Sequence, residues 1–112
     1  MTGRRLLGGF ESLLLLAVVR LREGAYGLSI RQELLDRAHR DVASGAIYTA
    51  LERLERKGFV ESWLGEPTAE RGGRAKRFYR VTAAGLRAFN DAQRAVQGLS
   101  TGLNMKEGKG HA

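Results

Sequence analysis

The chain contains no cysteine. It therefore cannot form a disulfide framework, bind a metal through thiolates or use a cysteine nucleophile, and a reducing cytoplasm suits it. Its two histidines, His39 and His111, stand far apart in the sequence and offer no metal-binding or catalytic spacing. The glycines fit neither a phosphate-binding loop nor a dinucleotide fingerprint. We therefore expect no cofactor, no metal site and no enzymatic activity.

Long hydrophobic runs are missing too. The apolar stretch at residues 13–19 ends at Arg20 and is far shorter than the roughly 20 residues of a membrane helix. Two arginines precede this stretch as in a signal peptide, but Glu11 interrupts the approach. The pattern favours a cytoplasmic protein that does not bind a membrane.

Negative charge is scarce. Lys and Arg number 19 against 12 Asp and Glu, which leaves a formal charge of +7 on 112 residues. In a chain long enough for only one domain, this imbalance favours a polyanionic partner such as nucleic acid. The alternative from composition alone is a basic surface that only keeps the protein soluble.

Hydrophobic periodicity predicts four helices, at residues 10–22, 28–38, 44–58 and 83–98. The first is apolar almost all round, whereas the others carry one apolar stripe each. Gly24 and Gly58 are placed to end the first and third helices. Ser44 and Thr82 are placed to cap the third and fourth. The chain is therefore expected to be mainly helical.

Residues 59–64 and 77–82 have strand character and are separated by a glycine-containing loop. Three helices, one hairpin and a further helix is the order of a mainly α (α+β) winged helix-turn-helix domain with a helical extension. Residues 70–80, in the wing, carry an excess of four positive charges where phosphates would lie. We expect a DNA-binding domain at 1–82, a dimerisation helix at 83–99 and a disordered tail at 100–112.

The third helix has an outward face on which a partner could bind. Tyr48 flanks this face, where its hydroxyl could contact a phosphate, although a purely structural tyrosine is nearly as common there. Arg53 and Arg56 are weaker candidates, because Glu52 lies four residues before Arg56 and can pair with it. The outward face comprises Gly45, Thr49, Glu52, Arg53 and Arg56.

Several segments together resemble one known family. They are SGAIYTALERLERKGFVE at 44–61 and ERGGRAKRFYRVTAAG at 70–85, supported by FESLLLLAVVRL at 10–21 and AYG at 25–27. These segments resemble the PadR family of bacterial transcriptional regulators. A single helix after the wing is similar to the short subgroup of that family, which puts an effector pocket built from a larger C-terminal domain in doubt.

The resemblance implies a homodimeric repressor that binds double-stranded DNA. By position it places the third helix, the start of the second helix and the wing at DNA. With the outward-facing Arg53, the candidate DNA-binding residues are Tyr26, Ser44, Gly45, Tyr48, Thr49, Arg53, Arg74, Lys76 and Arg77.

The last helix carries an apolar stripe that comes after the three-helix core has closed, and this surplus predicts a symmetric dimer. The first helix, apolar almost all round, is expected to contribute to the same interface. The predicted interface residues are Leu7, Phe10 and Leu14 of the first helix and Leu86, Phe89 and Val96 of the last.

Two other functions remain open. A winged helix can serve as a protein-interaction module without specific DNA binding, although that role favours an uncharged or acidic wing. RNA binding is compatible with the charge, but the two strands do not form the aromatic-rich pair on which single-stranded bases stack. No pattern in the sequence identifies the operator, the regulated gene or a small-molecule effector, and none distinguishes repression from activation.

Overall fold

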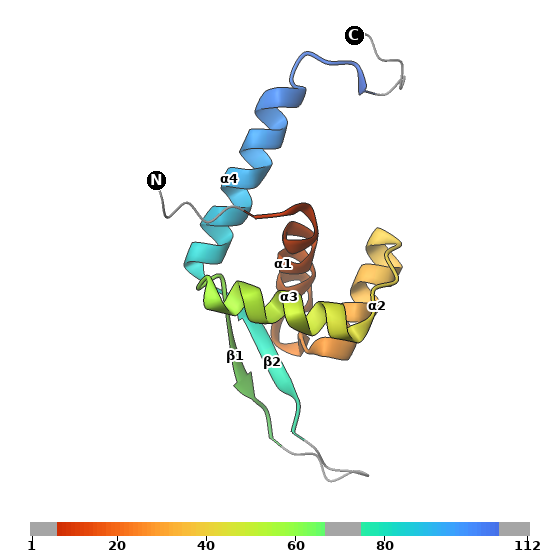
Figure 1. Cartoon of the computed structure of the whole chain (residues 1–112), viewed down its shortest axis with the longest axis vertical. Coiled ribbons are helices and arrows are strands. Elements are labelled where there is room, and N and C mark those ends of the chain that lie inside the picture. Colours follow the sequence, from red (N-terminus) through yellow and green to blue (C-terminus); the bar gives the residue numbers. More distant parts are fainter. Residues whose placement is uncertain (1–6, 67–74, 106–112) are drawn as a thin grey trace.

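A computed structural model describes residues 7–66 and 75–105 of the chain. Within these residues the fold is mostly helical with one antiparallel hairpin, as expected (Figure 1). No helix among them is long and apolar enough to cross a membrane. In chain order the elements are α1 (Gly9–Leu21), η1 (Arg22–Gly24), α2 (Gly27–Ala38), α3 (Ser44–Arg56), β1 (Val60–Leu64), β2 (Arg77–Val81) and α4 (Ala83–Ser100).

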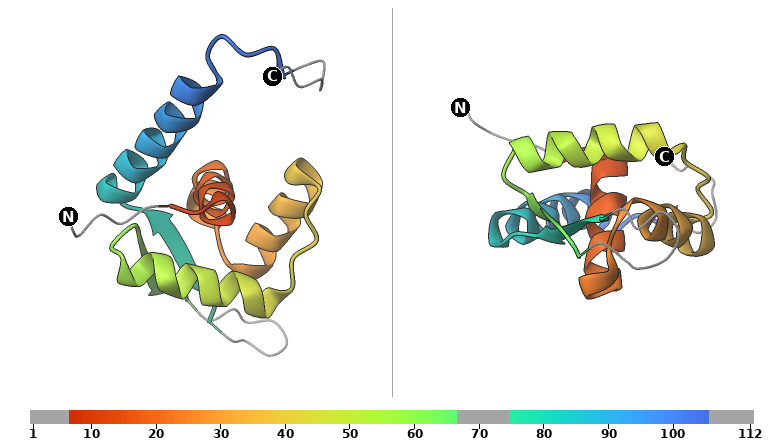
Figure 2. Two further views of the ribbon diagram at one scale, coloured as in Figure 1. Left: turned by 45° about the horizontal axis from the view of Figure 1, so that its top comes forward. Right: turned by 90° about the horizontal axis from the view of Figure 1, so that it is seen from below.

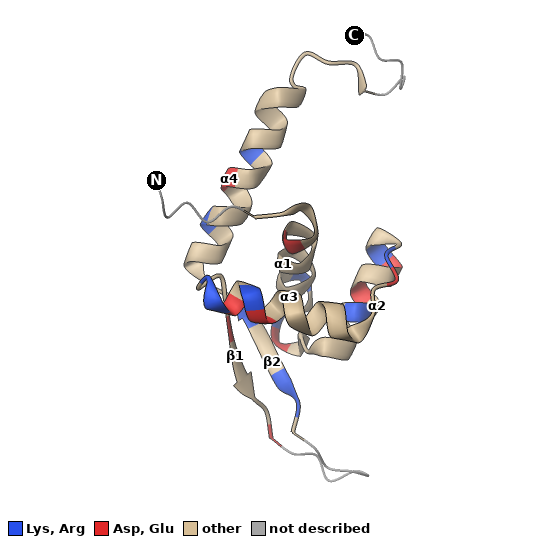
Figure 3. Cartoon of the chain, in the orientation of Figure 1, with Lys and Arg blue, Asp and Glu red and all other residues tan. Residues whose placement is uncertain are grey.

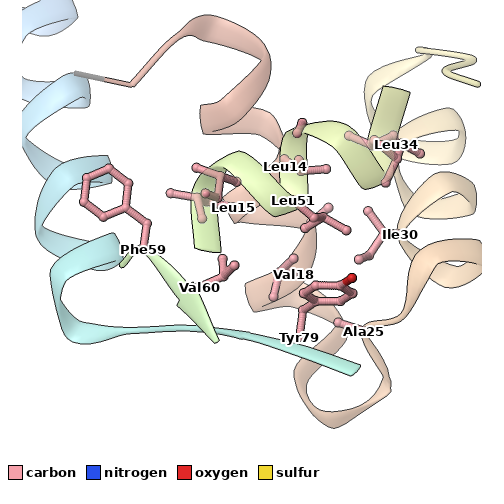
Figure 4. Packing of buried hydrophobic residues seen from close by; sticks show 14 residues of the cluster. Leu14, Leu15, Val18, Ala25, Ile30, Leu34, Leu51, Phe59, Val60 and Tyr79 are labelled. Carbon is pink, nitrogen blue, oxygen red and sulfur yellow. The ribbon is translucent and has the colours of Figure 1, made fainter. Parts of the chain in front are cut away.

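The core lies between α1, α2, α3 and the hairpin (Figure 4). Helix α1 supplies its centre, because a helix that is apolar almost all round is stable only when other elements cover it. Leu14 is 0% exposed and packs among core residues of the same chain. The expectation that Leu14 contacts a second chain is therefore wrong, since no part of its side chain reaches the surface.

Of the two predicted N-caps, the structure contains one and lacks the other. The Thr82 hydroxyl accepts a hydrogen bond from the Gly85 amide at 3.0 Å and so caps α4. Ser44 does not cap α3, because the helix begins one residue earlier than a serine cap requires and Ala43 occupies the N-cap position. At the other end, the positive φ of Gly58 (80°) lets the chain turn directly into the wing.

The wing is attached to the start of α2. Strands β1 and β2 pair in register from Val60 with Val81 to Leu64 with Arg77. The Tyr79 amide donates to the Ala25 carbonyl at 2.9 Å, and Tyr26 forms an isolated bridge with Phe78. These bonds place β2 against the turn before α2 (Figure 2). The wing and the helix-turn-helix therefore form one continuous surface.

Helix α4 packs on α1 only through its first turns and then extends away from the core (Figure 1). Gly85 is its one buried residue, and any larger side chain there would overlap the Phe59 carbonyl oxygen. The helix continues to Ser100, two residues beyond its predicted end. Of the tail expected to be disordered, residues 101–105 follow as turn and irregular chain, and 106–112 lie outside the described residues.

Candidate nucleic-acid interface

Helix α3 separates a buried face from an exposed one. The four predicted inner residues, Ile47, Ala50, Leu51 and Leu54, are buried in the core. Every other residue of the helix is exposed. An exposed stripe at successive helical turns faces away from the core; it consists of Gly45, Tyr48, Thr49 and Glu52.

Tyr48 lies across the start of α2. Its side chain is 48% exposed, and its ring and hydroxyl rest against buried Gly27, the first residue of α2. A Cβ atom at Gly27 would overlap the Tyr48 hydroxyl oxygen and Cζ. Position 27 therefore needs a glycine while Tyr48 keeps this orientation. Sequence reasoning did not select Gly27, although it lies in the AYG segment beside Tyr26.

Tyr26 and Lys76 meet where the wing joins α2. The Lys76 ammonium lies 4.7 Å from the centroid of the Tyr26 ring, which is a cation–π geometry. The other contact of that ring is edge-to-face with Phe78 at 5.6 Å. The two predicted DNA-binding residues are far apart in sequence and are brought together by the fold, with Lys76 exposed at the surface.

A hydrogen-bonded chain joins α3 to both strands. The Arg77 guanidinium donates to the Ser62 hydroxyl at 3.1 Å, and that hydroxyl donates to the Glu55 carboxylate at 2.9 Å. These residues line a cleft of about 450 Å³ between α3 and the wing, together with Tyr48, Glu52 and Tyr79. Burial raises the pKa of the Tyr79 phenol. The hydrogen bonds through Ser62 to Glu55 hold Arg77 on the side of the wing that faces α3.

Arg53 lies on the opposite flank of α3 from Tyr48, beside α1. Its guanidinium is 4.0 Å from the Glu11 carboxylate. Glu11 is only 7% exposed and accepts hydrogen bonds from the Lys57 ammonium at 3.1 and 3.2 Å and from the Gly8 amide at 2.9 Å. Arg53 thus sits at the edge of the exposed face rather than in the stripe.

Sequence reasoning used Glu11 only as an argument against a signal peptide and missed its ion pairs with the end of α3. The expected ion pair between Glu52 and Arg56 is not formed within the described structure.

The charges are unevenly placed along this surface (Figure 3). The first half of α3 carries no Asp, Glu, Lys or Arg, whereas the second half carries two glutamates and two arginines, and a lysine and an arginine stand at the loop end of the wing. An uncharged helix start beside the cations of the wing suits a base-reading segment next to phosphate contacts. Arg74, the remaining predicted DNA-binding residue, lies outside the described residues.

A model of a protein family, described as "Transcriptional regulator PadR-like family", matches residues 15–91. The chain belongs to this PadR-like family. The match covers α3, the wing and the first half of α4. No protein in a search of curated sequences matches the chain.

Solved structures agree with the PadR-like fold. A PadR family transcription regulator from Clostridium difficile aligns with a TM-score of 0.69 at 20% identity, over 91% of this chain and 100% of that one. A PadR-like transcriptional regulator from Bacillus cereus aligns with a TM-score of 0.68 at 24% identity, over 91% of this chain and 93% of that one. A PadR family transcriptional regulator from Eggerthella lenta aligns with a TM-score of 0.66 at 25% identity, over 88% of this chain and 84% of that one. The chain thus has the fold of a family of transcriptional regulators.

This PadR-like chain also leaves apolar surface uncovered on α4. Val96 is 64% exposed and Leu99 is 84% exposed. A groove of about 850 Å³ runs between residues 7–13 and the face of α4 that ends at Val96. Of the other residues predicted at a dimer interface, Leu86 is exposed, whereas Leu7, Phe10 and Phe89 are partly buried against the core of their own chain.

Proposed function

We propose that this PadR-like protein is a transcriptional repressor that binds double-stranded DNA sequence-specifically as a homodimer. The proposal rests chiefly on the joined surface of α3 and the wing, where Tyr48 packs on Gly27 and Lys76 lies over the ring of the neighbouring Tyr26. In winged helices the third helix enters the major groove and the hairpin lies along the backbone. A regulator of this kind acts in the cytoplasm, where a bacterial chromosome lies.

The contacts divide into two kinds. Lys76 and Arg77 are long cations at the loop end of β2, suited to phosphates and therefore to binding that does not depend on sequence. Ser44, Gly45 and Thr49 are small, exposed residues in the first half of α3, which allows that half to approach base edges closely. Tyr48 stands on the base-reading helix but is suited to a phosphate contact. Its hydroxyl lies at the N-terminal end of α2, where the helix dipole favours a phosphate.

The homodimer is supported by the bare apolar face of α4. Exposed leucine and valine side chains on a projecting helix are costly in water, and a second copy of the helix would cover them. A symmetric dimer also doubles the α3 and wing surface, as a palindromic operator requires. Repression is the simplest output for this architecture, because a dimer seated on a promoter blocks access to it.

The alternative is a winged-helix module that binds protein and not specific DNA. A gel-shift titration separates the two, using the full chain with a duplex from its own upstream region, a random duplex of equal length and a single-stranded RNA of the same sequence. We expect at least about tenfold tighter binding to the upstream duplex at physiological salt. Equal weak binding to all three, or tighter binding to RNA, would contradict the proposal.

A further inference from the structure

Helix α3 carries two acidic residues on the side that faces the wing, and they differ in how they are engaged. The Glu55 carboxylate accepts a hydrogen bond from Ser62, which in turn accepts one from Arg77. Glu52 lines the same cleft, but within the described chain its carboxylate has no hydrogen bond and no ion pair. Only one of the two acids is therefore free to meet a ligand.

Glu52 belongs to the exposed stripe. It lies one turn after Tyr48 and three residues after Thr49, so its side chain points from the same face of α3. If this face enters the major groove, Glu52 enters it as well. A carboxylate there is repelled by phosphates and by the acceptor atoms of guanine and thymine, because an ionised carboxylate can only accept hydrogen bonds.

Adenine N6 and cytosine N4 are the amino groups that face the major groove, and the N7 acceptor beside adenine N6 repels a carboxylate, so cytosine is the better matched partner. Cytosine presents an amino group on N4 in the major groove, and acidic side chains accept from it. We propose that Glu52 is a specificity-determining residue that accepts a hydrogen bond from the N4 amino group of a cytosine in the operator. Its charge also weakens binding to every sequence that lacks a donor at that position, so discrimination comes from repulsion as well as from attraction.

This inference rests on the proposed function, and selection from a pool of randomised duplexes tests both separately. The full-length wild-type chain, Glu52→Gln and Glu55→Gln are each taken through the selection. Both substitutions remove one negative charge from an exposed position of the same helix. Glu55 holds Arg77 through Ser62, and Arg77 is assigned to phosphates, so Glu55→Gln can change overall affinity and serves as the control for base preference alone. Circular dichroism checks that all three are equally helical.

We expect wild-type sites to contain one position that is fixed as cytosine. Glu52→Gln should lose that preference or replace it with adenine, whose N6 and N7 atoms suit an amide. Its affinity for random duplex should rise about threefold at low salt, and its specificity ratio should fall about tenfold. Glu55→Gln should keep the wild-type base preference.

Recovery of the same base pattern by Glu52→Gln as by wild type would overturn the role of Glu52 and leave the proposed function intact. A shift in base preference for Glu55→Gln of equal size would also overturn it. If wild type itself enriches no sequence, the proposed function fails, and the inference fails with it.

Discussion

Gly27→Ala should weaken DNA binding while leaving the protein folded. A Cβ atom at position 27 would overlap the Tyr48 hydroxyl and Cζ and would stand 2.9 Å from Cε1, whereas ordinary contacts between carbons are about 3.5–4.0 Å. The ring must therefore move by at least about 0.6 Å at Cε1, and further at the hydroxyl. Because Tyr48 is about half exposed, it can swing into solvent instead of straining the core.

The expected change in stability is small. Overpacking at a rigid site costs about 1–3 kcal/mol, but a mobile ring escapes most of that cost. Alanine is also a better helix former than glycine by up to about 1 kcal/mol. The net change in the free energy of unfolding should stay within about 1 kcal/mol, which shifts Tm by less than about 8 °C in a domain of this size.

The expected change in binding is larger. If the Tyr48 hydroxyl donates to a phosphate, its displacement removes a hydrogen bond to a charged group, worth about 1.5 kcal/mol or somewhat more, so Kd rises about tenfold. Fluorescence anisotropy with a selected duplex measures Kd, and thermal melting followed by circular dichroism measures Tm.

Gly9→Ala is the matched control, because Gly9 is the first residue of α1 and has open space where a Cβ would stand. It should leave Kd unchanged. In a Tyr48→Ala background, Gly27→Ala should have almost no further effect on binding. Wild-type affinity for Gly27→Ala, or an equal loss with and without Tyr48, would refute the reasoning.

Four further predictions follow from the same surfaces. Lys76→Ala should weaken cognate and random duplexes by similar factors and lower the slope of log affinity against log salt by about one, measured by anisotropy at several salt concentrations. Thr49→Ala should weaken the cognate duplex more than the random one. Replacing Val96 and Leu99 by Asp should give a folded monomer in sedimentation velocity, and a stable dimer would contradict the α4 interface. Glu11→Ala should lower the free energy of unfolding by about 2 kcal/mol in urea denaturation, because it removes a buried carboxylate that accepts hydrogen bonds from Lys57 and from the Gly8 amide.

Much of the fold could be predicted because periodicity reports local structure. The apolar stripes placed the four α-helices to within a few residues, and strand-forming residues on either side of a glycine-containing loop placed the hairpin. The place of Leu14 could not be predicted, because α1 is apolar almost all round and its pattern does not show which face meets which neighbour. Ser44 was a sound cap by propensity, yet the path of the chain between α2 and α3 put Ala43 at the cap position instead.

The candidate site was predictable residue by residue but not as an arrangement. Tyr26 and Lys76 were each selected, whereas their contact depends on the pairing of β2 with the turn before α2, which no local pattern encodes. Gly27 and Glu11 were missed for the same reason. The need for glycine at 27 arises from a tyrosine 21 positions away, and the partners of Glu11 lie at the end of α3.

The central claim, that α3 and the loop end of β2 form the DNA surface, is tested most directly by nuclear magnetic resonance. Amide chemical shifts of the isotope-labelled full chain are recorded while a selected duplex is added. The account predicts that the largest changes fall at Tyr26, at residues 44–49 and at Lys76 and Arg77, with the second half of α4 almost unchanged. Changes centred on α4 or on the outer face of the hairpin, with residues 44–49 unaffected, would contradict it.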